Sequence, residues 1–348
     1  MLNRFRLRPS TSAITVRPRL ACEITVEGII AARQESALDS AAITAFTPLG
    51  PGLLTPGLVS PNIPDRPPVI AAIKQALDEV AARGRQVSLI IPDLAARVLL
   101  LDFDTLPASQ AEALPILRFR LRKLLPFEVD DAAVSYQIVH QDSQQVRTVV
   151  AVTPRTVLAE YETALREAGY LPGAVLPSTL ASLAVVPESD NALVVSCSSA
   201  SVTSAITRGN ELLLYRTLDL PHEERERSQE LQQVVTVAMA YFEDTMSAPP
   251  DVLFYVGAGG AEQLSRILNP DDPANYPTEL PLADNSQPED DDLESVNALA
   301  TSGRLAADLQ PDDDRTILVR DLVPTPSTGA ATSMPPGLLA GVVGALAN

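Results

Sequence analysis

The chain has few of the residues that most metal sites and nucleophilic enzymes depend on. Its 348 residues include no tryptophan, two cysteines and two histidines. Cys22 and Cys197 lie in apolar runs without a Cys-x-x-Cys spacing, and His140 and His222 have no serine, aspartate or cysteine partner at a recognisable spacing. The sequence therefore indicates no disulfide framework, zinc site or catalytic triad. We expect no catalytic residue and no metal ligand.

Positive charge and long apolar runs are also scarce. The chain has 26 Lys and Arg residues against 44 Asp and Glu residues, a formal net charge of −18. Such a chain repels a phosphate backbone, so nucleic acid is not an expected partner. No apolar run reaches the roughly 18 residues of a membrane-spanning helix, and no apolar segment follows the first arginines as in a secretory signal. We expect a cytoplasmic protein.

The charge that is present divides unevenly along the chain. Residues 1–20 contain five arginines and no acid, and we treat 1–18 as a basic N-terminal extension. Residues 270–314 contain thirteen acids and one arginine. Like charges repel one another and offer little apolar area against the cost of ordering the chain, so we expect this segment to be an exposed, mobile insert.

Hydrophobic periodicity predicts two similar halves, since 46% of the residues are hydrophobic and their spacing alternates between strand and helix patterns. Each half opens with a β-hairpin and continues into strand and helix units. The first half has predicted strands at 19–26, 28–33, 87–91 and 95–101 and a helix at 69–83; the second has strands at 192–197, 201–207, 211–218, 251–256 and 316–323 and helices at 224–246 and 335–347. Between them we predict helices at 109–125, 154–168 and 177–186 and strands at 134–140 and 146–152.

Several local motifs, in order, resemble those of the PilM-like proteins of type IV pilus assembly. They are Leu-Ile-Ile-Pro-Asp at 89–93, the basic helix that ends in Leu-Pro-Phe-Glu at 125–128, Tyr-Gln at 136–137, and the strand and helix over 147–168. The resemblance covers roughly residues 19–348. It implies an α/β protein with the duplicated actin/Hsp70-like (ribonuclease H-like) fold and a small inserted α+β subdomain. The implied parts are 19–106 and 187–269 for the two halves of the core, 107–186 for the subdomain, and 315–348 for the C-terminal strand and helix.

The nucleotide motifs of this superfamily are degenerate in the chain. In actin-like ATPases two Gly-rich hairpins bind phosphates and an Asp holds the metal. The first hairpin has Glu23 and Thr25 where the resemblance implies Asp and Gly, and the second, Ser196 to Ser201, lacks both. Any remaining nucleotide contacts are then expected from Ser198, Ser199, Thr203, Gly257, Gly259 and Gly260. The glycine run at 257–260 has two interpretations, an adenosine contact or a tight strand-to-helix turn. We expect no cofactor, with ATP and Mg²⁺ as the alternative.

The resemblance also implies a partner. It implies a scaffold that binds the cytoplasmic tail of a PilN-like inner-membrane protein, together with other pilus assembly platform proteins, and so lies peripherally at the inner membrane. Arg118 and Arg122 share one face of the 109–125 helix, which is either a solvated face or, with Leu125 and Phe127, part of the docking groove. The alternatives are an active actin-like ATPase and the cytoplasmic domain of a type II secretion platform protein.

Overall fold

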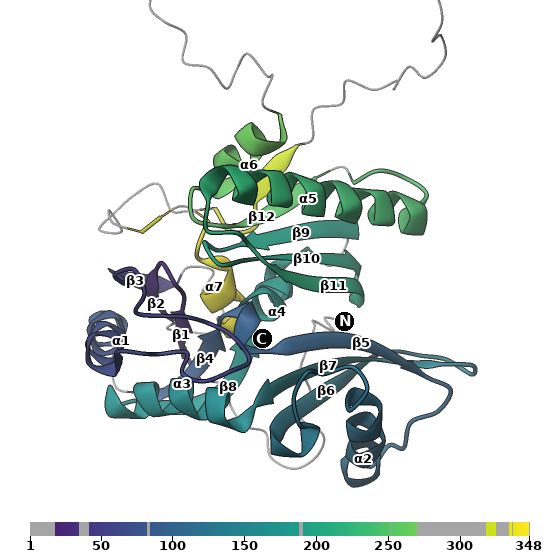
Figure 1. The fold of residues 1–348 in the computed structure, drawn as a ribbon, viewed down its shortest axis with the longest axis horizontal. Helices are drawn as coiled ribbons and strands as arrows, with labels where there is room; N and C mark the ends of the chain where they lie inside the picture. The colour runs from purple at the N-terminus through teal and green to yellow at the C-terminus, as the bar shows by residue number, and fades with distance from the viewer. Residues whose placement is uncertain are drawn as a thin grey trace, which may run out of the picture. The chain divides into compact units, whose positions relative to one another are not determined.

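The computed structural model describes residues 18–34, 42–81, 84–187, 191–250, 252–269, 318–324, 334–335 and 337–347. The predicted acidic insert, and the predicted basic extension apart from Pro18, lie outside the described residues. Three sheets carry the described part (Figure 1). None of its helices is long and apolar enough to cross a membrane.

The first sheet has five strands in the order β3-β2-β1-β4-β8. β1, β2 and β3 form an antiparallel meander, and β4 and β8 add parallel to β1 and to each other. Their bounds are β1 Leu20–Ile24, β2 Gly28–Arg33, β3 Ile43–Pro48, β4 Gln86–Ile91 and β8 Leu171–Pro177. Helices α1 (Arg66–Val80) and α3 (Arg155–Glu167) cover one face, and α4 (Ser178–Ser182) and α7 (Ala340–Leu346) cover the other.

The second sheet repeats this topology in the order β11-β10-β9-β12-β13. Its meander is antiparallel, and β12 and β13 add in parallel, as β4 and β8 do. The strands are β9 Asn191–Cys197, β10 Ser201–Arg208, β11 Glu211–Asp219, β12 Leu253–Gly257 and β13 Val319–Asp321. Helices α5 (Glu224–Met246) and α6 (Gly260–Leu268) pack on one face. Two sheets of identical topology confirm the predicted duplicated fold.

The third sheet, β5-β7-β6, belongs to the inserted subdomain. Its strands are β5 Arg97–Phe103, β6 Ala132–Gln141 and β7 Val146–Pro154, and α2 (Gln110–Leu121) packs on it through Leu117 and Leu121. Short 3-10 turns precede β5 (η1, Asp93–Ala95) and β6 (η2, Val129–Asp131), and a third follows α4 (η3, Leu183–Val185).

The bounds of this sheet differ from the predicted subdomain of 107–186. The sheet begins with β5 at Arg97, because β5 pairs along its whole length with β7. After Pro154 the chain returns to the first core: α3 packs against the first sheet and β8 pairs with β4. The three-stranded sheet and α2 therefore span Arg97 to Pro154.

Two strands of the first sheet, β3 and β8, were not expected from the sequence. β8 reads Leu-Pro-Gly-Ala-Val-Leu-Pro, and proline and glycine argue against a strand. It is an edge strand, bonded only to β4 and with an irregular register, which is where a sheet tolerates proline. β3 is also at an edge and only half-buried, so its apolar signal is weak.

Candidate functional site

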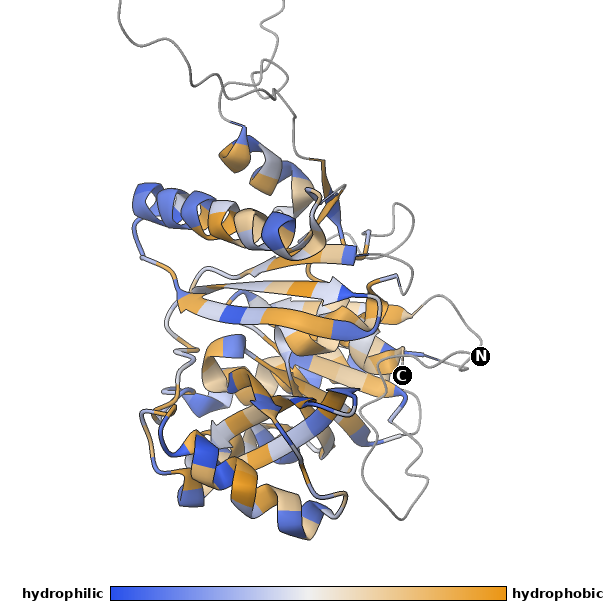
Figure 2. Ribbon diagram, turned by 90° about the vertical axis from the view of Figure 1, so that its right-hand side faces the viewer, coloured by the Kyte–Doolittle hydropathy of each residue, from blue (hydrophilic) through white to orange (hydrophobic). Residues whose placement is uncertain are grey.

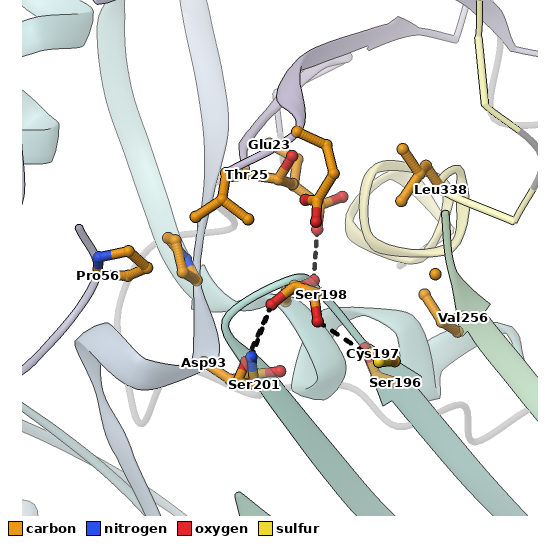
Figure 3. Close-up of a pocket in the computed structure, with 15 residues that line it drawn as sticks. Glu23, Thr25, Pro56, Asp93, Ser196, Cys197, Ser198, Ser201, Val256 and Leu338 are labelled. Carbon is orange, nitrogen blue, oxygen red and sulfur yellow. Dashed lines mark hydrogen bonds between the residues drawn. The ribbon is translucent and has the colours of Figure 1, made fainter. Parts of the chain in front are cut away.

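A small cavity lies between the tips of the β1–β2 and β9–β10 hairpins, where the PilM-like resemblance implies phosphate-binding motifs. Its volume is about 40 Å³, and its lining includes Glu23, Thr25 and Glu27 from the first hairpin and Ser196 to Ser198 and Ser201 from the second (Figure 3). Ligand pockets usually have volumes of about 300–1,000 Å³. The cavity as it stands is therefore too small for a phosphate chain.

The first hairpin closes its turn with its own side chain. The Thr25 hydroxyl donates to the Gly28 carbonyl at 2.9 Å and accepts from the Gly28 N–H at 3.1 Å. Gly28 is required there, since a Cβ would lie 2.6 Å from the Thr47 carbonyl. Thr25 and Gly28 are thus hydrogen-bonded to each other within the hairpin.

The N–H groups at the tip of the second hairpin also have hydrogen-bond acceptors within the chain. The Ser198 hydroxyl accepts from the Ala200 and Ser201 N–H groups at 3.2 and 3.1 Å. The Ser199 N–H donates to the Glu27 carboxylate of the first hairpin at 2.8 Å. Successive N–H groups in such a turn form an anion-binding concavity. Glu27 supplies the anion here, so a phosphate would have to displace it.

Asp93 joins the two halves of the core beneath this cavity. It lies in η1, directly after β4, and is buried. Its carboxylate accepts from the Thr179 N–H (3.1 Å) and hydroxyl (2.5 Å) of α4. It also accepts from the Thr203 hydroxyl of β10 at 3.1 Å and the Tyr215 hydroxyl of β11 at 2.8 Å. Burial raises the pKa of Asp93, and these hydrogen bonds oppose that rise. Thr203, a predicted nucleotide contact, is a partner of Asp93.

Glu23 is the residue at the position of the expected metal-binding Asp. It is 3% exposed, and the Ser178 hydroxyl donates to its carboxyl group. Burial raises the pKa of Glu23 to about 7, the hydrogen bond from Ser178 lowers it, and the nearby Asp93 and Glu27 charges add to the rise. A carboxyl group in this setting is half protonated near neutral pH, which weakens it as a metal ligand.

The glycine run at 257–260 forms the turn between β12 and α6. Gly259 and Gly260 have φ of +91° and +68°, a region that side chains disfavour. A Cβ on Gly257 would lie 2.5 Å from the Cys197 carbonyl. The Gly257 N–H donates to the Gly337 carbonyl at 3.1 Å, so the C-terminal segment lies against this turn.

An N–H group in the first turn of α6 also has a partner within the chain, because the Ala261 N–H donates to the Asp321 carboxylate at 2.7 Å. The positive φ of Gly259 and Gly260 and the close approach of the Cys197 carbonyl to Gly257 are sufficient to explain these glycines. Carboxylates of the chain therefore occupy N–H groups in two of the three elements expected to contact a nucleotide.

The electrostatics of the cavity oppose a polyanion. Among the described residues that line it there are three carboxylates, Glu23, Glu27 and Asp93, and no lysine or arginine. Cys197, also in the lining, has its pKa raised to about 11 by burial. The thiol is thus neutral at physiological pH and a poor nucleophile.

The four residues expected to bind a partner lie at α2 and the segment after it. Arg118 is half-buried, and its guanidinium donates to the Val129 carbonyl and, at 3.2 Å, to the Ala132 carbonyl. Arg122 pairs with Asp130 at 3.0 Å. Leu125 and Phe127 pack against the core of the subdomain. Arg118 thus holds α2 to the start of β6, and the charges of this face are engaged within the chain.

Sequence reasoning did not identify the contacts of Asp93, Asp321 or Glu27. Their partners lie 60 to 172 residues away along the chain. No local spacing could signal such contacts. Among the described residues, no group of three or more His, Cys, Asp or Glu side chains is arranged to hold a metal ion.

No protein family model and no curated protein matches the chain in sequence. Among solved structures it is similar to a chain of a PilM-PilN type IV pilus biogenesis complex, with a TM-score of 0.59 and 20% identity, covering 72% of this chain and 87% of that one. It is also similar to the cytoplasmic domain of EpsL, an inner membrane component of the type II secretion system of Vibrio cholerae (TM-score 0.44, 13% identity, covering 68% and 81%). A Bacteroides thetaiotaomicron protein of unknown function with an actin-like ATPase fold gives a TM-score of 0.44 at 10% identity, covering 72% and 86%. Together with the duplicated sheets, the similarity to the chain of the PilM-PilN complex shows that this chain has the actin-like fold and confirms the PilM-like resemblance at the level of the fold.

Proposed function

We propose that the chain is an actin-like scaffold of a pilus or secretion assembly machine, and that it binds the cytoplasmic tail of a PilN-like inner-membrane protein. In this role it lies in the cytoplasm, at the inner membrane through its partner, and contacts other platform proteins. The observation that supports the proposal is the fold similarity to a chain of a PilM-PilN complex over 87% of that chain.

The scaffold role does not need a nucleotide. The cavity of about 40 Å³, its three carboxylates and the Glu27 contact to the Ser199 N–H all oppose a bound triphosphate. The alternative, an active ATPase, needs a metal-binding carboxylate and free N–H groups at the hairpins. No contact among the described residues that line the cavity favours an active ATPase.

Partner binding is tested by calorimetry with a peptide of the cytoplasmic tail of a single-span membrane protein encoded beside this chain. We expect saturable one-to-one binding that weakens when Phe127, next to the subdomain core, is replaced by leucine. A matched control is Phe46→Leu, at the far edge of the first sheet. No binding by the native chain would refute the proposed partner.

Nucleotide binding is tested separately by calorimetry with ATP and Mg²⁺. We expect no saturable heat with ATP up to about 1 mM. Any free energy of binding would then be weaker than roughly −4 kcal/mol. A low-micromolar dissociation constant would establish the ATPase alternative. Tail binding without ATP binding supports the scaffold.

A further inference from the structure

The outer face of α2 carries large apolar side chains that are exposed to solvent. Ile116 is 40% exposed and Phe119 is 64% exposed, whereas Ala113, Leu117 and Leu121 on the inner face are buried. Figure 2, which looks at the side of the molecule that carries α2, shows hydrophobic and hydrophilic residues interleaved along this helix. Exposed aromatic and aliphatic side chains side by side commonly mark an interaction site.

Charged residues flank this apolar centre with opposite signs at the two ends. Glu112 lies in the first turn of α2, and Lys123 lies just after its last residue, with its ammonium group 5.8 Å from the centre of the Phe119 ring. Glu112 has no ion-pair partner among the described residues. Arg122, next to Lys123, is by contrast paired with Asp130.

The four positions form one stripe along the helix. Glu112, Ile116, Phe119 and Lys123 are spaced 4, 3 and 4 residues apart, which keeps them on one face. The stripe is about 16 Å long at 1.5 Å per residue. Its midpoint falls between positions 117 and 118, so it reads acid, apolar, apolar, base in one direction and the reverse in the other.

This pattern is complementary to itself when reversed. If a second α2 packs antiparallel about a two-fold axis, Glu112 of each copy lies opposite Lys123 of the other, and Ile116 of each lies opposite Phe119 of the other. An isologous interface needs this kind of self-complementary patch. We propose that the stripe Glu112, Ile116, Phe119 and Lys123 is a homodimer contact that joins two copies of this chain through antiparallel α2 helices.

The charge pattern favours a second copy over an anionic membrane. A membrane surface attracts clusters of Lys and Arg. The last turn of α2 also carries Arg118 and Arg120, but the stripe itself has one base and one acid, and the whole chain has a net charge of −18. One helix pair buries less than the roughly 800 Å² per partner of a standard interface. We therefore expect weak association, with a dissociation constant of roughly tens of micromolar or above.

Sedimentation equilibrium of the full chain over a concentration series tests the contact. The average mass of the native chain is expected to rise from 37.1 kDa toward twice that value as the concentration approaches about 1 mM. Phe119→Glu should hold the chain at the monomer mass. Val237→Glu is the matched control, since Val237 is also an exposed apolar side chain on a helix, α5. It should leave the association unchanged.

Charge reversal tests the antiparallel register. Glu112→Lys alone and Lys123→Glu alone each place like charges opposite one another, so each should weaken self-association about three- to tenfold. An equimolar mixture of the two variants places opposite charges at both ends and should associate at least as tightly as the native chain. The double variant should also associate.

Three results would overturn the proposal. These are a native chain that stays monomeric at about 1 mM, an equal effect of Val237→Glu and Phe119→Glu, and a mixture that associates no better than either single variant. Binding of the native chain, but not of Phe119→Glu, to vesicles containing phosphatidylserine, without self-association, would assign the stripe to a membrane instead. Every substituted side chain is exposed, so unchanged circular dichroism melting curves show that the variants fold.

Discussion

Glu23 is a buried carboxyl group whose ionisation the fold opposes. Its pKa of about 7 lies above the ordinary value of 4.5, mainly because of burial. Between these two values the folded chain binds more protons at this site than the unfolded chain does. The contribution of Glu23 to the free energy of unfolding is therefore fully present below about pH 4.5 and is lost as the pH rises through about 7.

Replacing Glu23 with glutamine should remove this pH dependence. Gln cannot ionise, so the stability of the variant relative to the native chain should be about 2–3 kcal/mol higher at pH 8 than at pH 5. Its amide oxygen can accept from Ser178, but its NH2 group takes the place of Oε2, which has no hydrogen-bond partner among the described residues, so a constant cost of about 1–3 kcal/mol is expected at both pH values. Urea unfolding at the two pH values measures both. Glu79→Gln, exposed on α1, is the control. A difference from the native chain of the same size at both pH values would contradict the pKa assignment.

Asp93 stabilises the fold through the donors that converge on it. Asp93→Ala leaves the hydroxyls of Thr179 and Tyr215 buried without this acceptor, so we expect a loss of about 3 kcal/mol or more in the free energy of unfolding. Asp93→Asn keeps one acceptor oxygen and removes the buried charge, and should cost less. Asp104→Ala, at an exposed position, should stay within about 0.5 kcal/mol. Equal losses in Asp93→Ala and Asp104→Ala would show that the network contributes little.

At the scale of elements, periodicity predicted the β1–β2 hairpin, the second meander and most helices, because their cores are formed by alternating or helically spaced apolar residues. It failed for the two edge strands of the first sheet: β3 is only half-buried, and β8 contains prolines that edge pairing tolerates and a central strand would not. It also assigned both Arg118 and Arg122 to one exposed face. A four-residue spacing fixes the face of a helix, but not which side chain reaches across to a carbonyl on another element.

Arg118 and Arg122 should therefore differ in their effect on stability. Arg118→Ala removes two charge-assisted hydrogen bonds that hold η2 and β6 to α2, so we expect a loss of about 2–3 kcal/mol. Arg122→Ala removes an exposed ion pair and should cost less than about 1 kcal/mol. Urea unfolding of the two variants measures the difference. If Arg118→Ala is as mild as Arg122→Ala, Arg118 does not anchor α2.

At the scale of the whole molecule, the sequence predicted the duplicated core but not what joins its halves. The hairpins and glycine turn were identified in order along the chain, since each is a local pattern. The contacts of Glu27 with Ser199 and of Asp93 with Thr203 and Tyr215 depend on how two separate sheets face each other. Their residues are 110 to 172 positions apart. No periodicity carries that information.

The Glu27 contact joins the rims of the two halves, so its removal should be visible at the second hairpin rather than in global stability. In Glu27→Ala the Ser199 N–H loses its carboxylate acceptor. Because this contact is exposed, the cost in unfolding free energy should be below about 1 kcal/mol. Hydrogen exchange at Ser199 should accelerate several-fold, because the amide becomes open to water. The Ala200 and Ser201 amides, which donate to Ser198, should keep their rates. Glu27→Gln, which keeps an acceptor oxygen, should change Ser199 less. Unchanged exchange at Ser199 in Glu27→Ala would show that its N–H is not held by Glu27, and the carboxylate would then not be what keeps an anion from this hairpin.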